Sequence, residues 1–312
     1  LNTRGTFEAD LVAMRLSNET YLIFVGTTSV KRDLAWLKNH LQPDELVHLK
    51  DETELYATLA LAGPDSSRAV AEVGAQELNE LKYFHHTKTE IGGTSILAMR
   101  VSFVGESGWE LVFKADRAES VGEVLLKAGA KPAGLFAQSS MRIEKRFAVM
   151  GHELDGDVTP LEAGLEFAID WNKDFLGREA LLRKRDEGLS QSLITIVLDD
   201  PQAVPLGNEP VLKDGTIIGK TTSASFGYRI GKPLALAFLT NGRMADLNES
   251  KVHVDIAGQY YSGNVSQQSA FDPSGPRSWP CAPSPCAACV LCSSSCAPSS
   301  PCAAPAAARS SR

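Results

Sequence analysis

The sequence contains 312 residues, of which 43% are hydrophobic, and it carries a formal net charge of −7. This length suffices for one or two hydrophobic cores. The acidic balance argues against a general nucleic-acid-binding surface, which requires clustered Lys and Arg. No apolar window approaches the roughly 18 residues of a membrane span. We therefore expect a protein that neither binds nucleic acid nor crosses a membrane.

The chain begins with the residues LNTRG, without an initiator Met and without a cleavable secretory signal. We interpret this start as the middle of a longer sequence, so the first domain is expected to be truncated at its N-terminus. All six cysteines lie beyond residue 280. A body without cysteine has no disulfide framework, which fits a reducing, intracellular compartment.

The first 188 residues alternate between strands and helices. Period-two alternation and turn residues predict strands over 7–12, 20–25, 55–62, 94–104 and 109–115. Apolar residues at helical spacing predict helices over 29–41, 66–73, 118–128 and 138–147. Hairpins and short helices join most of these strands, so we predict an α+β fold for residues 1–188 rather than a doubly wound sheet.

Residues 189–270 change to short β runs, which include 192–198, 210–213, 234–239 and 251–256. Such runs, separated by turn residues, predict a small antiparallel β-barrel as a second domain. From residue 271 to residue 312, Pro, Ala, Ser and Cys dominate the composition. This stretch cannot form a periodic apolar face, so we predict a disordered tail.

The tail contains four cysteines at the spacing of a bacterial iron–sulfur cluster run: Cys286, Cys289, Cys292 and Cys296. Thiolates at this spacing can surround a cluster, but these lie among Ala, Ser and Pro residues that provide no core to exclude water. The adjacent pair His85 and His86 lacks a third ligand nearby and is expected in a loop. We therefore predict no metal site.

Three stretches of sequence carry a family signal. They read LNTRGTFEADL at 1–11, SFVGESGWEL at 102–111, and MRIEK, TPLEAGL and DFLGREAL between residues 141 and 181. In this order and at these separations they resemble the glycine-cleavage T-proteins, which are aminomethyltransferases. The sequences GWEL and LEAGLEF are more similar to those of dimethylglycine and sarcosine dehydrogenases. Together with residues 221–239, the similarity covers nearly all of residues 1–266.

The resemblance implies that residues 1–188 form a T-protein-like folate-binding domain. It implies a one-carbon transfer from a methylamine-derived substrate to tetrahydrofolate, which forms 5,10-methylenetetrahydrofolate. It also implies a dehydrogenase-like parent whose FAD is bound only by a missing N-terminal half, because no G-x-G-x-x-G follows a strand in this chain. The expected location is the mitochondrial matrix for a eukaryotic protein and the cytoplasm for a bacterial one.

Two other functions stay open at this point. A glycine-cleavage aminomethyltransferase would accept its aminomethyl group from a lipoyl carrier protein, which needs a docking surface. A non-catalytic relative resembling the pyruvate dehydrogenase phosphatase regulatory subunit is kept open by two departures from the family pattern. Phe103 replaces the usual Tyr before the Gly-Glu turn, and Ser139-Ser140 lies in a helix that lacks its usual Asp.

Carboxylates are natural partners for the aminopyrimidine edge of a pterin, because two oxygens can accept two parallel N–H bonds. The resemblance places Glu106 and Glu110 at the folate site, with Glu110 favoured as the pterin ligand, and makes Asp10 the catalytic acid/base or electrostatic group. Between Ala9 and Leu11, Asp10 can be partly desolvated and have a raised pKa. The alternative is that all three carboxylates are solvated residues of strands and hairpins.

Two arginines and a tyrosine complete the predicted folate site. Arg142 and Arg178 each offer a guanidinium fork for the carboxylate of the folate tail or of the substrate. The alternative for both is an intramolecular pair with Glu144, Glu162 or Glu179. Tyr228 either closes the site from the second domain or is a core or interface aromatic residue.

Overall fold

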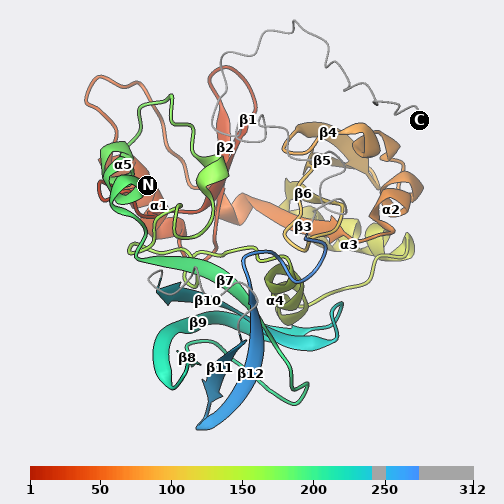
Figure 1. Cartoon of the computed structure of the whole chain (residues 1–312). Coiled ribbons are helices and arrows are strands. Elements are labelled where there is room, and N and C mark those ends of the chain that lie inside the picture. Colours follow the sequence, from red (N-terminus) through yellow and green to blue (C-terminus); the bar gives the residue numbers. More distant parts are fainter. Residues whose placement is uncertain (241–250, 274–312) are drawn as a thin grey trace, which may run out of the picture.

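The computed structural model describes residues 1–240 and 251–273, which form two connected parts (Figure 1). The first part contains the hairpin of β1 (Leu11–Arg15) and β2 (Tyr21–Val25), helix α1 (Val30–Asn39) and a four-stranded antiparallel sheet. The second part is a closed barrel of six strands. An α+β domain followed by a small antiparallel barrel is the predicted fold, and the structure confirms it.

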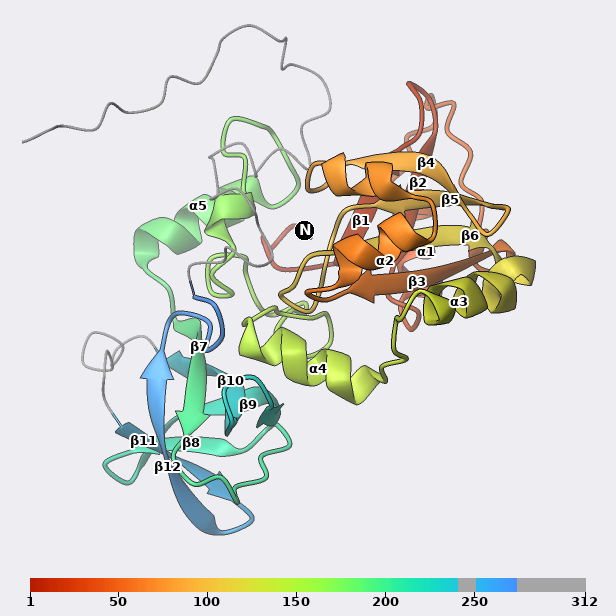
Figure 2. The ribbon, with the colours of Figure 1, turned by 90° about the vertical axis from the view of Figure 1, so that its right-hand side faces the viewer.

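The four-stranded sheet is the centre of the first part. Its strands lie in the order β3, β6, β5 and β4, and each neighbouring pair is antiparallel. Their bounds are β3 (Tyr56–Ala62), β4 (His86–Ile91), β5 (Thr94–Met99) and β6 (Gly108–Lys114). Helices α2 (Ser66–Glu72) and α3 (Ala118–Lys127) pack against one face of this sheet (Figure 2).

Alternation along β6 separates the two faces of the sheet. Trp109, Leu111 and Phe113 are buried in the main hydrophobic core together with residues of α2 and α3. The intervening residues Glu110 and Val112 therefore point to the opposite face. The carboxylate of Glu110, in the middle of β6, is thus directed away from the core that α2 and α3 cover.

The hairpin of β1 and β2 covers this opposite face. Met14 of β1 is almost fully buried and forms a small hydrophobic cluster with Met99 of β5 and with Val101. The Nε2 atom of His86 lies 2.9 Å from the carbonyl oxygen of Arg15, at the end of β1. The expectation that His86 lies in a loop is wrong, because this residue begins β4 and ties the sheet to the hairpin.

The barrel follows two further helices, α4 (Leu135–Glu144) and α5 (Arg178–Glu187). Its antiparallel strands close in the order β10, β7, β12, β11, β8 and β9. Closure leaves no exposed edge strand, and apolar residues of the strands fill the interior. The strand bounds are β7 (Gln191–Leu198), β8 (Pro210–Lys213), β9 (Thr216–Gly227), β10 (Lys232–Thr240), β11 (Lys251–Ile256) and β12 (Gln259–Ser266).

Several element boundaries differ from the sequence prediction. β1 begins at Leu11 rather than at residue 7, and α4 begins at Leu135 rather than at residue 138. Helix α5 is not predicted, because Leu181 is the one buried residue on this otherwise polar segment. The predicted tail lies outside the described residues, apart from residues 271–273, and so do all of its cysteines. None of the helices in the described ranges has the length and apolarity needed to cross a membrane.

Candidate functional site

Asp10 stands immediately before β1, where the N-terminal segment enters the hairpin. Its side chain is exposed, yet desolvation by the surrounding protein raises its pKa. The two observations agree because nearby protein removes part of the hydration of the carboxylate while its side chain still contacts solvent. It forms no hydrogen bond or ion pair with any described residue. Asp10 is therefore available to a ligand.

Glu110 is the second carboxylate without a partner. It lies in β6 between Ala60 of β3 and Met99 of β5. The side chain is half-buried and forms no hydrogen bond or ion pair with any residue that the structure describes. Burial raises the pKa of Glu110, since no cation or donor offsets the lost hydration. The sequence pattern alone could not show this isolation.

Tyr83 is a neighbour of Glu110 that the sequence analysis missed. Burial raises the pKa of Tyr83, and the charge of Glu110 adds to this shift, while the backbone of Ser102 hydrogen-bonds to the phenol and lowers it. The next residue, Phe84, has a φ of 59°, a left-handed backbone conformation that bulky residues rarely adopt. Such backbone outliers cluster at functional sites, but a dipeptide of two aromatic residues carries no sequence signal of this strain.

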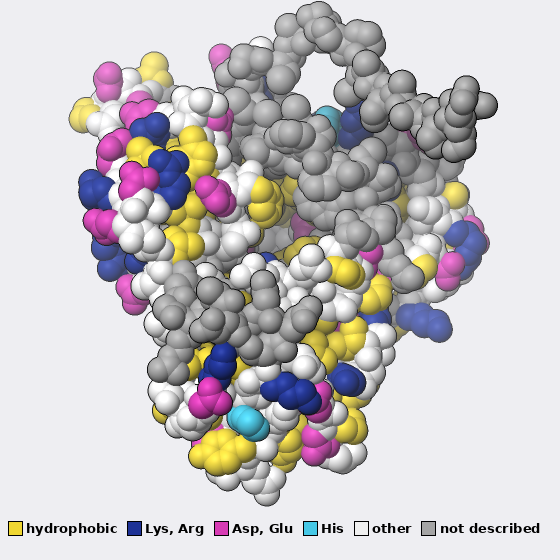
Figure 3. Space-filling model, in the orientation of Figure 1, with side chains coloured by type: hydrophobic (Ala, Val, Ile, Leu, Met, Phe, Trp, Pro, Cys, Tyr) yellow, Lys and Arg dark blue, Asp and Glu magenta, His cyan; other side chains and the backbone are white. Residues whose placement is uncertain are grey.

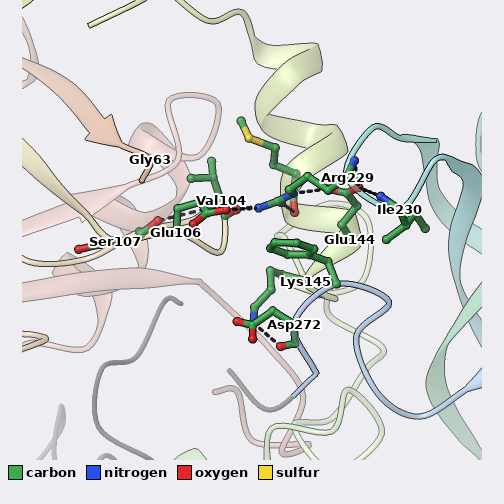
Figure 4. Close-up of polar contacts among 12 residues, drawn as sticks. Gly63, Val104, Glu106, Ser107, Glu144, Lys145, Arg229, Ile230 and Asp272 are labelled. Atoms are coloured by element: carbon green, nitrogen blue, oxygen red, sulfur yellow. Dashed lines mark hydrogen bonds and ion pairs between the residues drawn. The ribbon is translucent and has the colours of Figure 1, made fainter. Parts of the chain in front are cut away.

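Glu106 has an intramolecular partner, Arg229, in the turn between β9 and β10 (Figure 4). The Nη1 atom of Arg229 lies 3.2 Å from Oε1 of Glu106, and its Nε lies 2.5 Å from Oε2 of the fully buried Glu144. Its Nη2 donates to the carbonyl oxygens of Val104 and Met141 at 3.0 and 2.9 Å. Through Arg229, Glu106 therefore joins the two parts of the chain, and its contact with folate stays a prediction.

The chain that follows the barrel returns to the same place. The ring of Phe271 lies 4.0 Å from Cζ of Arg229, and its backbone N–H donates to the carbonyl oxygen of Glu144 at 2.9 Å. Lys145 and Asp272 form a buried ion pair, with Nζ and Oδ2 3.0 Å apart (Figure 4). Residues 271 and 272 were assigned to the tail from composition, and the structure shows them packed on α4.

Arg142 is buried, and its guanidinium is already engaged. Nη1 lies 3.0 Å from Oε2 of Glu153 and donates to the carbonyl oxygen of Phe147 at 3.2 Å. Nη2 donates to Oγ of Ser223 in β9 at 2.6 Å. This network holds α4 against the barrel, and both terminal nitrogens already donate to protein acceptors. The described contacts of Arg142 are therefore structural, and its role in folate binding stays a prediction.

Arg178 and Tyr228 lie apart from these contacts. Nη1 of Arg178 pairs with Glu179 at 2.9 Å, and Nη2 donates to the carbonyl oxygen of Trp171 at 3.1 Å. The pair with Glu179 is the alternative that the sequence left open. The side chain of Tyr228 is 80% exposed and contacts Phe226 edge to face, so it is neither a core residue nor an interface residue in this structure.

Two carboxylates, those of Asp10 and Glu110, are thus partly desolvated and have no counter-charge among the described residues. A half-buried carboxylate with free oxygens can accept a pair of N–H donors from a ligand, and a carboxyl group with a raised pKa keeps its proton to a higher pH than an ordinary carboxyl group does. Desolvated groups of this kind are candidates for functional residues. Among the described residues, no three His, Cys, Asp or Glu side chains are placed to hold a metal ion.

The surface of the molecule is mixed in charge. Lys and Arg side chains are interspersed with Asp and Glu on the face that Figure 3 displays, including the part over α5 and the barrel. The view shows no continuous basic surface, which is consistent with the net charge of −7.

Comparison with known proteins gives matches over both parts of the chain. Residues 1–173 match the family model described as the GCVT N-terminal domain, and residues 191–272 match the glycine cleavage T-protein C-terminal barrel domain. The mitochondrial dimethylglycine dehydrogenase of Rattus norvegicus is 31% identical over 279 residues, which cover 86% of this chain and 32% of that protein. The aminomethyltransferase of Rubrobacter xylanophilus is 34% identical over 241 residues, which cover 77% of this chain and 64% of that protein.

A solved structure shares the fold. The glycine cleavage system aminomethyltransferase T from Bartonella henselae superposes with a TM-score of 0.77 at 23% sequence identity, over 88% of this chain and 74% of that chain. This chain spans about a third of the length of the dimethylglycine dehydrogenases and just under two thirds of the aminomethyltransferases that it matches. The two family models match successive segments that correspond to the sheet-containing part and the barrel, and the chain belongs to the glycine cleavage T-protein family.

Proposed function

We propose that this chain binds tetrahydrofolate and takes part in the transfer of a one-carbon unit to it, which gives 5,10-methylenetetrahydrofolate. The observation that carries the proposal is the pair of carboxylates, Glu110 and Asp10, that have no protein partner among the described residues and have raised pKa values. Membership of an aminomethyltransferase family supports a transferase reaction.

Glu110 is assigned to the pterin. Its two carboxylate oxygens match the parallel N–H donors of an aminopyrimidine edge, and hydrogen bonds to an ionised carboxylate are strong when water is partly excluded. These donors favour the ionised form, so folate binding should lower the pKa that burial has raised. The phenol of Tyr83 provides a second polar group beside this carboxylate.

Asp10 is assigned to the reaction centre. Because desolvation raises its pKa, Asp10 can hold a proton at a pH where an ordinary Asp is ionised, or release it to a nearby basic nitrogen. Its exposed side chain lets the substrate reach it from solvent. The one-carbon chemistry itself is supplied by the folate nitrogens, and the chain contributes binding, orientation and proton handling.

The parent reaction is also part of the proposal. Similarity to dimethylglycine dehydrogenases over 86% of this chain supports a longer, FAD-dependent oxidoreductase of the dimethylglycine or sarcosine dehydrogenase type, with FAD bound outside this chain. In a eukaryote we would place such a protein in the mitochondrial matrix. The second candidate is a glycine-cleavage aminomethyltransferase, which the 34% identity to a bacterial aminomethyltransferase favours. That function would require a lipoyl carrier protein as partner.

The first test is calorimetric titration of the chain with tetrahydrofolate. We expect binding that Glu110→Gln weakens by about tenfold or more, because a bidentate, charge-assisted contact is lost. The matched control is Glu90→Gln on the exposed side of β4 in the same sheet, which should bind like the parent. A well-folded parent that does not bind, or equal effects of the two substitutions, would overturn the assignment.

A second measurement separates catalysis from binding. In a longer protein that carries this chain, Asp10→Asn should leave tetrahydrofolate affinity within about threefold and lower the rate of 5,10-methylenetetrahydrofolate formation by about 100-fold or more. Folate binding without any product formation by the parent protein would instead favour the non-catalytic, regulatory relative. Turnover that depends on a lipoyl carrier would favour the aminomethyltransferase.

A further inference from the structure

Three cationic side chains lie at the C-terminal end of α4, and two of them have carboxylate partners. Arg142 pairs with Glu153, and Lys145 pairs with Asp272, each at 3.0 Å. Arg146 is the next residue in the chain, and it forms no ion pair with any residue in the described part of the structure. Its positive charge therefore has no counter-charge among the described residues, unlike those of Arg142 and Lys145.

The backbone and side chain of Arg146 are nevertheless held in a defined position. Its φ is 57°, in the left-handed region that favours glycine. Its Nη2 atom donates to the carbonyl oxygen of Leu193 in β7 at 2.5 Å. The guanidinium lies against Gly164, where an added Cβ would come within 3.0 Å of Nη2. The absence of a side chain at Gly164 therefore leaves space for the guanidinium of Arg146.

The hydrogen-bonding capacity of this guanidinium is only partly used. Its Nε is buried without an acceptor among the described residues, and Nη1 has no described partner either. Burial lowers the pKa of Arg146, and no carboxylate opposes that effect. An arginine stays charged at physiological pH all the same, so the free-energy cost of its lost hydration remains. An anion brought by a ligand would remove this cost.

Two packing contacts connect the surroundings of Arg146 with the segments that precede Glu110 and Asp10 in the chain. Its neighbour Phe147 stacks on Phe103, with ring centroids 5.8 Å apart, and Phe103 lies in the turn that leads into β6. On another side, Leu193 belongs to the same hydrophobic cluster as Phe7, close to the start of β1. Arg146 thus follows a helix whose end packs on the turn before β6, and it donates to a residue of the cluster that contains Phe7.

We propose that Arg146 is a receptor for the carboxylate of a small ligand, and this proposal rests on the proposed binding of tetrahydrofolate. A guanidinium fork matches a carboxylate in geometry and charge. Folate is elongated, and its carboxylates are on the glutamate end, remote from the pterin that is assigned to Glu110. An N-methylated amino acid would bring the same chemical group. Arg142 and Arg178 are less suited to this role, because their terminal nitrogens already have protein acceptors.

The test compares tetrahydrofolate with tetrahydropteroate, which has the pterin and the aminobenzoate but no glutamate. The parent chain should bind tetrahydrofolate about tenfold more tightly than tetrahydropteroate, and Arg146→Gln should abolish this difference without changing the affinity for tetrahydropteroate. Arg146→Lys should restore part of it, because the charge returns without the fork. Arg117→Gln, on an exposed segment before α3, is the charge-matched control.

A second variant guards against a simple loss of folding. Arg146→Gly removes the guanidinium at a backbone conformation that suits glycine, so it should unfold at a temperature no lower than the parent and still lose the preference for tetrahydrofolate. A measured loss of stability together with an unchanged preference would show that Arg146 is merely structural.

The two sources of the carboxylate are separated by a further arm. If the parent binds both pteridines equally, the chain saturated with tetrahydropteroate is titrated with dimethylglycine and with its uncharged amide. If dimethylglycine binding depends on Arg146, the carboxylate that Arg146 receives is that of the amino acid. If neither the preference for tetrahydrofolate nor the binding of dimethylglycine depends on Arg146, the proposal is overturned. If tetrahydropteroate binding depends on Glu110 but not on Arg146, the proposed function stands. If neither pteridine binds, both the proposed function and the proposal for Arg146 are overturned.

Discussion

The guanidinium of Arg229 neutralises Glu144, a carboxylate that has no exposed surface, with Nε and Oε2 2.5 Å apart. Arg229 comes from the barrel, and Glu144 comes from the helix that carries Arg142 and precedes Arg146. The barrel thus supplies the counter-charge for a group inside the first part. A buried carboxylate that loses its partner is costly, whatever the net contribution of the intact pair.

The substitution Arg229→Ala is expected to lower the free energy of unfolding by about 3–5 kcal/mol, because Glu144 would stay buried without its cation. Urea denaturation of the whole chain measures this loss. Arg68→Ala breaks an exposed pair with Glu72 on α2 and should cost less than about 1 kcal/mol. Equal losses for the two variants would contradict this prediction, because they would show that Glu144 does not depend on the charge of Arg229.

Residues 271–273 are expected to stabilise the fold although they follow the last strand. A chain that ends at residue 270 loses Asp272 and leaves Lys145 buried without its partner, and it also loses the ring of Phe271 over Arg229. It should be less stable than a chain that ends at residue 273 by about 3 kcal/mol or more. Thermal unfolding of the two chains at the same pH would reveal the difference, and identical midpoints would contradict it.

Gly177 and Gly122 should respond in opposite directions to alanine. Gly177 has a φ of 86°, and a Cβ there would lie 2.8 Å from the backbone nitrogen of Gly5, so Gly177→Ala should destabilise the protein by at least about 1–3 kcal/mol. Gly122 lies within α3 with open space around it, so Gly122→Ala should stabilise by about 0.5–1 kcal/mol. Paired urea titrations would establish both signs.

The stability conferred by Glu110→Gln should depend on pH. Because burial raises the pKa of Glu110, the folded chain releases this proton at higher pH than the unfolded chain does. Stability of the parent is therefore lost as pH rises from about 4, the unfolded value, through the folded pKa. Glu110→Gln avoids this loss, so its melting temperature should exceed that of the parent at pH 7–8 and approach it near pH 4. A constant difference across this range would contradict the shift.

The arrangement of strands and helices was largely predictable, because core-facing residues of the sheet and barrel recur at regular periods. Trp109, Leu111 and Phe113 alternate along β6 and lie in the core as period two requires. Helix α5 was not predictable in the same way, because it buries Leu181 alone. The position of His86 at the start of a strand also lacked a local signal.

The site was predictable only in its residue types. Asp10 and Glu110 differ from Glu106 in having no described partner, and that difference depends on Arg229, which lies 123 residues beyond Glu106 in the chain. Arg142 likewise finds Ser223 in a strand of the second part. Pairing of charges between distant segments is fixed by tertiary structure, so motif spacing could not separate carboxylates without a described partner from those in ion pairs.

The long separation between Glu106 and Arg229 also bears on the order in which the chain folds. Lys145 and Asp272 are likewise 127 residues apart. Neither this ion pair nor that of Glu106 with Arg229 can form before most of the described chain has left the ribosome. The turn before β6 and the end of α4 must wait for the barrel, even though their own residues emerge much earlier. Contacts between residues so far apart in the sequence slow folding, and they couple the folding of the sheet-containing part to that of the barrel.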